Sequence, residues 1–125
     1  MTSHRPKLLV VENDPDSLEA MAEILRGSGH VVMEARSGKE ALRALESAAP
    51  PDLVILDRYL GDMSAEQVLA RTSQTPRIAR IPVALVSGSD DRLDCPQVVA
   101  RLRKPFEPEA LDALVLEMSR GAYRG

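Results

Sequence analysis

The stretch Leu53–Asp57 reads LVILD, four consecutive apolar residues followed by an acid. An apolar run this short, without polar alternation, is typical of a strand buried on both faces of a parallel sheet. It is the most apolar run of its kind in the chain, so we expect it at the centre of the sheet. Four more strands are expected at Lys7–Val11, His30–Met33, Ile81–Val86 and Val98–Arg103.

Helical patterns separate these strands. Asp14-Pro15 reads as an N-cap followed by proline in the first turn, and Gly27 and Gly29 end that helix. Capping boxes at Ser37–Glu40 and Ser64–Gln67 predict two further helices, and Glu107-Pro108 opens a last one. Strands that alternate with helices predict a doubly wound α/β fold around a parallel sheet. We expect one domain at 7–118, with tails at 1–6 and 119–125.

Composition limits the function classes. The chain has 125 residues, 44% of them hydrophobic and 28% charged, which suits one globular domain. A net charge of −3 argues against a dedicated nucleic-acid binder. No apolar run approaches the ~20 residues of a membrane helix, and the start is not of signal-peptide type. Cys95 is the single cysteine, so we expect a reduced, cytoplasmic setting and an unreactive thiol.

Chemically useful side chains follow the predicted strands. In open α/β sheets, ligands bind beyond the carboxyl ends of the strands. Acids, a hydroxyl and an amine are expected to converge there: Glu12, Asn13, Asp57, Ser87 and Lys104. This set suits metal-assisted acceptance of a phosphoryl group by a carboxylate.

Four motifs in register resemble the receiver domain of two-component response regulators. They are LLVVENDPDSL (8–18), PDLVILD (51–57), PVALVSG (82–88) and LRKPFEPEAL (102–111). The resemblance covers about Lys7–Met118. It implies a flavodoxin-like, five-stranded parallel sheet in the order 2-1-3-4-5.

The resemblance also implies roles for the residues at the strand ends. Asp57 would be the phosphoacceptor, supplied by a histidine kinase or a histidine phosphotransfer protein. Ser87 and Lys104 would bind the phosphoryl group, and Lys104 would also pair with the Asp57 carboxylate. The expected Mg²⁺ ligands are Glu12, Asn13, Asp57 and the backbone carbonyl of Tyr59. The Lys104-Pro105 peptide would be cis.

The chain departs from the receiver pattern at several positions. Asn13 stands where the family usually has aspartate, Gly61 where it has proline, and Ala65 where it has glycine. Arg101 holds the switch position that is usually aromatic. About five residues are missing between Ser87 and Lys104, so the helix between the fourth and fifth strands is expected to be very short or absent.

These departures leave alternatives open. The chain could be a pseudo-receiver, an interaction module that does not depend on phosphorylation. A phosphatase of the haloacid-dehalogenase type is disfavoured, because the residue two after Asp57 is Tyr59 rather than a second acid. If the domain does switch, its output would come from the first helix, from the loop after Asp57 or from changed dimerisation.

Overall fold

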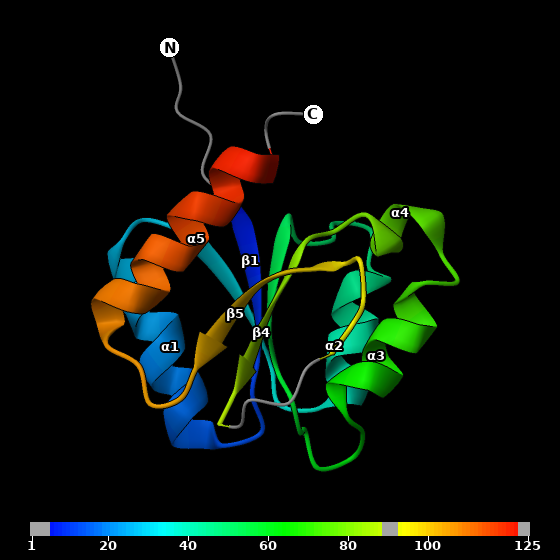
Figure 1. Cartoon of the computed structure of the whole chain (residues 1–125), viewed down its shortest axis with the longest axis horizontal. Helices are drawn as coiled ribbons and strands as arrows, with labels where there is room; N and C mark the ends of the chain where they lie inside the picture. The colour runs from blue at the N-terminus through cyan, green and yellow to red at the C-terminus, as the bar shows by residue number, and fades with distance from the viewer. Residues whose placement is uncertain (1–5, 89–92, 123–125) are drawn as a thin grey trace.

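The structure, a computed structural model, describes residues 6–88 and 93–122. A five-stranded sheet forms the middle layer, and helices cover both of its faces (Figure 1). The strands pair in parallel in the order β2-β1-β3-β4-β5, which confirms the predicted fold class. Their bounds are β1 Lys7–Val11, β2 Val31–Ala35, β3 Leu53–Asp57, β4 Val83–Ser87 and β5 Val98–Arg103.

Two strands begin later than their apolar runs predict. The backbone N–H of His30 donates to the carbonyl of Leu25 at 3.1 Å, so His30 belongs to the turn that ends the preceding helix. Ile81 likewise donates to the carbonyl of Ile78 at 3.0 Å, before β4 begins. In both places hydrogen bonding to a helix end outweighs the local preference for a strand.

The helices form one layer on each side of the sheet. Helices α1 (Pro15–Gly27) and α5 (Pro108–Ala122) lie on one face (Figure 1). Helices α2 (Gly38–Leu45), α3 (Ala65–Thr72) and the short α4 (Pro76–Ala79) lie on the other. No described helix is both long enough and apolar enough to cross a membrane.

Strand alternation builds two separate cores. Leu8 and Val10 of β1 face the α1 and α5 side, whereas Leu9 and Val11 face the α2 and α3 side. All four are essentially inaccessible to solvent. Because successive side chains of a strand point to opposite faces, one apolar run supplies both cores.

The helix starts agree largely with the predicted caps. Asp14 accepts a hydrogen bond from the N–H of Ser17 at 3.1 Å, and Ser64 and Gln67 form the reciprocal capping box. The predicted box at Ser37 is only half made. Its hydroxyl accepts from the N–H of Glu40, but the Glu40 carboxylate accepts from Arg36 instead of Ser37.

The last helix extends into the residues that were expected to form the C-terminal tail. Helix α5 continues to Ala122, and Ser119 is buried with its hydroxyl donating to the carbonyl of Val115 at 2.8 Å. Ser119 follows Val115 by four positions, so it continues the buried stripe of the helix. Pro6, expected in the N-terminal tail, is also buried. The rest of the two expected tails, 1–5 and 123–125, lies outside the described residues.

The connection from β4 to β5 is short. Its described part, Leu93–Gln97, contains no helix, and residues 89–92 lie outside the description. Gln97 holds this connection to the helices beside it. Its buried side-chain amide donates to the carbonyls of Ile78 and Ile81, both at 2.9 Å, and accepts from the hydroxyl of Thr72 at 3.0 Å.

Candidate functional site

Four strand ends meet at one rim of the sheet and bring together the predicted polar residues. Asp57 ends β3, Ser87 ends β4, and Glu12 and Lys104 directly follow β1 and β5. The strands are parallel and in register, with Asp57 opposite Val86, so their carboxyl ends lie side by side. The backbone N–H of Lys104 donates to the carbonyl of Ser87 at 2.9 Å, which ties the last two strand ends together.

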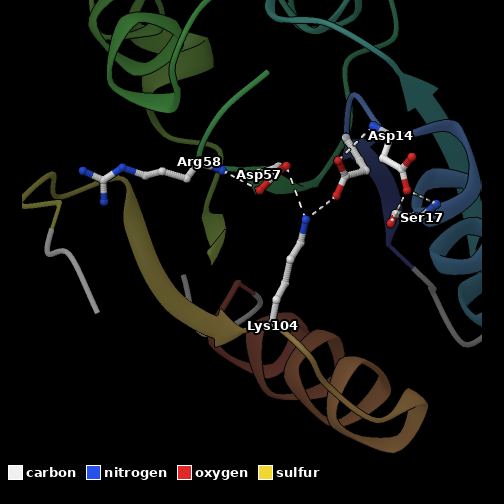
Figure 2. Close-up of polar contacts among 6 residues, drawn as sticks. Asp14, Ser17, Asp57, Arg58 and Lys104 are labelled. Atoms are coloured by element: carbon white, nitrogen blue, oxygen red, sulfur yellow. Dashed lines mark hydrogen bonds and ion pairs between the residues drawn. The ribbon is translucent and has the colours of Figure 1, made fainter. Parts of the chain in front are cut away.

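Lys104 lies between the two acids. Its side chain extends from the end of β5 toward Asp57 (Figure 2). The ammonium nitrogen is 2.6 Å from Glu12 Oε1 and 3.4 Å from Asp57 Oδ2. Burial alone would lower the pKa of Lys104. The hydrogen bond to Glu12 and the charges of Asp57 and Glu12 outweigh that effect and raise its pKa. The shorter contact therefore goes to Glu12, although the sequence suggested only the pairing with Asp57.

Asp57 is a partly buried carboxylate with a raised pKa. Its side chain is 13% exposed, and Oδ1 accepts from the N–H of Arg58 at 2.9 Å. Burial, followed by the charge and hydrogen bonding of Glu12, raises the pKa of Asp57 to about 6, against the opposing effect of Lys104. Near neutral pH the group is therefore mostly ionised. A carboxylate with an ammonium group beside it can act as a nucleophile toward phosphorus.

Glu12 is fixed more firmly than Asp57. It is 1% exposed, and its second oxygen, Oε2, accepts from the N–H of Asp14 at 3.0 Å. Asp14 itself caps α1 by accepting from the hydroxyl of Ser17 at 2.7 Å as well as from its N–H (Figure 2). These two hydrogen bonds lower the pKa of Asp14 and commit its carboxylate to the helix start.

The donor set fits a hard cation, provided that neutral oxygens contribute. Glu12 and Asp57 bring two negative charges against one ammonium group, and burial together with the charge of Glu12 raises the pKa of Asp57. Among the residues that the structure describes, no three His, Cys, Asp or Glu side chains cluster as a metal site. The exposed Asn13 lies close by, with Nδ2 3.6 Å from where a Cβ on Gly61 would be. Its amide oxygen and the backbone carbonyl of Tyr59 are the neutral donors that the sequence predicts for such a cation.

Arg58 and its partners were not predicted. The Arg58 side chain, 8% exposed, points away from Asp57 and Lys104 (Figure 2). Its Nη2 is 2.8 Å from Glu66 Oε2, and the guanidinium carbon is 5.9 Å from the ring centroid of Tyr59. Glu66 follows a loop that separates β3 from α3, so no helical spacing rule relates it to Arg58. The sequence signal for this pair was the position of Arg58 directly after a buried strand, because a buried charge requires a partner.

The expected switch residue lies apart from these groups. Arg101 is on the exposed face of β5, opposite Leu85 in register. Its Nη2 donates to the carbonyl of Leu93 at 2.7 Å, so the guanidinium is directed to the β4–β5 connection and to solvent.

Comparison with known proteins identifies the family. Residues 8–116 match the model of the response regulator receiver domain. Protein Rrf1 of Nitratidesulfovibrio vulgaris is 31% identical over 110 residues, covering 87% of this chain and 79% of Rrf1. The DNA-binding response regulator MtrA of Mycolicibacterium smegmatis is 32% identical over 127 residues. That match covers 92% of this chain, which spans only about half of MtrA, 51% of its length.

Solved structures agree with the sequence match. The receiver domain of a signal transduction histidine kinase from Syntrophus aciditrophicus has a TM-score of 0.81 and 26% identity, covering 97% of this chain and 95% of that one. The receiver domain of sensor histidine kinase PA1611 from Pseudomonas aeruginosa shares the fold. It has a TM-score of 0.81 at 22% identity, covering 91% of this chain and 97% of its own, and has a magnesium ion coordinated in the active site cleft. The chain belongs to the response regulator receiver domain family.

Proposed function

We propose that this domain accepts a phosphoryl group on Asp57 and thereby switches its contacts with other proteins. The donor would be a phosphohistidine on a cytoplasmic histidine kinase or histidine phosphotransfer protein. The observation that carries the proposal is the placement of Asp57. It ends β3 as a partly buried carboxylate, with the ammonium group of Lys104 3.4 Å away and Glu12 beyond it.

The step itself is a transfer between two nucleophiles. A carboxylate oxygen of Asp57 attacks phosphorus, the N–P bond of the phosphohistidine breaks, and the imidazole keeps the bonding electron pair. The product is an acyl phosphate, which water later hydrolyses back to carboxylate and phosphate. The domain is therefore a signalling module with slow self-dephosphorylation, and not an enzyme in the turnover sense.

Lys104 and Ser87 can stabilise the negative charge on the phosphoryl oxygens during the transfer. The Lys104 ammonium already contacts Asp57, and a phosphoryl group on that carboxylate would bring further negative oxygens to it. Ser87 is buried at the end of the neighbouring strand and offers a hydroxyl donor. Because both residues are placed by the sheet, little reorganisation is needed for the transfer.

Mg²⁺ is the cation we assign to the rim. Glu12, Asp57, Asn13 and the carbonyl of Tyr59 would hold it, and the bound cation would supply positive charge to offset that of the phosphoryl oxygens. The magnesium ion in the PA1611 receiver domain supports this choice by analogy.

A second candidate function is a phosphorylation-independent interaction module. Two observations favour it. Asn13 removes a charge from the cation site, and Arg101 is bonded to Leu93 in place of an aromatic switch. Under this alternative, Glu12, Asp57 and Lys104 would serve only as a structural ion-pair network.

Labelling with a small phosphodonor separates the two candidates. Wild-type protein incubated with acetyl phosphate and Mg²⁺ should gain one phosphoryl group in its intact mass, and Asp57→Ala should gain none. Asp16→Ala removes an exposed carboxylate at the start of α1 and should label like wild type. Labelling that persists in Asp57→Ala would refute the phosphoacceptor assignment, and unlabelled wild type would favour the interaction module.

A further inference from the structure

The loop that follows Asp57 provides the helix cap for another part of the chain. Asp62 lies in this loop, between β3 and α3. Its Oδ1 accepts from the N–H of Gly38 at 2.8 Å, and its Oδ2 accepts from the N–H of Lys39 at 3.0 Å. These are the first two residues of α2, whose own N-cap, Ser37, reaches only the N–H of Glu40. The first turn of α2 is therefore completed by a residue 24 positions away from Gly38.

A second contact joins the same two segments. A Cβ on Gly38 would collide with the side chain of Met63, so the loop lies directly against the start of α2. Gly38 is buried by this approach. The Asp62 carboxylate and the Met63 side chain thus attach the loop at adjacent points, one polar and one apolar.

The loop itself is closed into a short hairpin. Ala65 donates to the carbonyl of Arg58 at 2.8 Å, and Leu60 donates to the carbonyl of Met63 at 3.1 Å. Gly61 makes the turn at φ +83°, a conformation that favours glycine. The hairpin starts at the phosphoacceptor strand and carries Tyr59, so Asp62 and the backbone beside Asp57 belong to one hydrogen-bonded segment.

We infer that Asp62 is a positioning residue that holds the Tyr59 carbonyl in place for the cation at Asp57. The inference rests on the proposed function. It goes further by coupling the site to the first turn of α2. Coupling between two sites is reciprocal. If the Asp62 contact favours cation binding, cation binding must stabilise the Asp62 contact to the same degree. The start of α2 then senses the state of Asp57 through the loop after β3, and the β4–β5 connection is not involved.

A matched pair of variants tests this inference. Asp62→Ala and Ser37→Ala each remove one side-chain cap from α2, so both should lower the melting temperature to a similar extent. Only Asp62→Ala also removes the polar attachment of the loop to α2. In calorimetric titrations with Mg²⁺, its dissociation constant should rise about three- to tenfold, the range expected from one helix cap. Ser37→Ala should stay within about twofold of wild type, and Asp62→Asn, which keeps one acceptor oxygen, should be intermediate.

The reciprocal effect gives an independent readout. Mg²⁺ should slow hydrogen exchange at the amides of Gly38 and Lys39 in wild type and not in Asp62→Ala. Equal Mg²⁺ affinities in Asp62→Ala and Ser37→Ala, with unchanged exchange at Gly38, would overturn the inference and leave the proposed function intact. A wild type that binds no Mg²⁺, or binds it equally well after Asp57→Ala, would contradict the cation site of the proposed function, and the inference with it.

Discussion

The rim around Asp57 and the side of the molecule around the β4–β5 connection are held together by different kinds of contact. At the rim, charged groups from three strand ends converge, with Lys104 2.6 Å from Glu12 and 3.4 Å from Asp57. Along the described part of the connection, Leu93–Gln97, there is no helix, and single side chains such as Gln97 and Arg101 attach it to its surroundings.

The difference shows which part of the fold constrains the chemistry. Parallel pairing places the ends of β1, β3, β4 and β5 next to one another, whatever the length of the segments that join them. A connection can shorten without moving Asp57 or Lys104, because loop length costs little once the sheet has formed. Chemistry and output can therefore change separately, and each of the following experiments tests that separation.

The largest effect is expected from Lys104→Met. The ammonium group faces both acids, and its removal takes away the cation that stabilises charge on the transferring group. The rate of labelling by acetyl phosphate should fall about 10²-fold. The matched control, Arg101→Met, removes a cation from the exposed face of the same strand and should label within about twofold of wild type. Similar losses in both variants would show that the two regions are not separable.

The second effect concerns the stability of the side of the molecule around the β4–β5 connection. In Gln97→Met, the carbonyls of Ile78 and Ile81 lose a donor, and the hydroxyl of Thr72 loses an acceptor. The loss of three buried hydrogen bonds should lower the free energy of unfolding by about 2 kcal/mol, measured by urea denaturation. Labelling of Asp57 should be unchanged, since Gln97 precedes β5 at the opposite end of the strand from Lys104. The matched control is Gln74→Met, at an exposed position. A labelling defect in Gln97→Met would show that the rim depends on the side around the β4–β5 connection.

The sequence predicted the rim better than the side around the β4–β5 connection, for a physical reason. Strand ends and helix caps depend on neighbours within a few residues, so Asp57, Lys104 and the cap at Asp14 could be located from local patterns. The pairings Thr72–Gln97 and Arg58–Glu66, and the cap that Asp62 gives to Gly38, depend on how distant segments pack. Helix α4 was missed for a different reason, because its four residues lack both an apolar stripe and a side-chain cap.

The third effect is a pH-dependent stability of the rim. Burial and the charge of Glu12 raise the pKa of Asp57 to about 6, so the folded state disfavours the ionised carboxylate. Replacing it with a neutral isostere, Asp57→Asn, should raise the free energy of unfolding at pH 7.5 by about 1 kcal/mol, discounted for partial solvent exposure. Thermal melts across pH measure this gain.

The stability gain from Asp57→Asn should grow as the pH rises. Between about pH 4 and pH 6 the folded wild type binds more protons at Asp57 than the unfolded chain does, so its stability decreases as the pH rises. The gain of Asp57→Asn should therefore disappear below about pH 4, where the carboxyl is protonated in both states. Asp62→Asn is the opposite case. Hydrogen bonds from Gly38 and Lys39 help to lower the pKa of Asp62, so this substitution should destabilise at neutral pH. A pH-independent difference for Asp57→Asn would contradict the account of the rim.

The smallest effect is expected from Asn13→Asp. A carboxylate at this position restores a charge for a cation held by Glu12 and Asp57, so Mg²⁺ affinity should rise. The gain should be only about threefold in calorimetric titrations, because the exposed position is screened by solvent and salt. Leu116→Glu adds the same charge on the exposed face of α5 and should leave the affinity unchanged.

The same substitution should have the opposite effect without Mg²⁺. A third acid near Glu12 and Asp57 adds like charge around Lys104, so the pKa of Asp57 should rise further above 6. In metal-free buffer, Asn13→Asp should melt at a lower temperature than wild type at pH 7.5, and Mg²⁺ should reverse the order. If the variant binds Mg²⁺ no better than wild type, Asn13 is not a cation ligand. The rim then depends on Glu12, Asp57 and backbone oxygens alone, and the charge that Asn13 lacks does not weaken it.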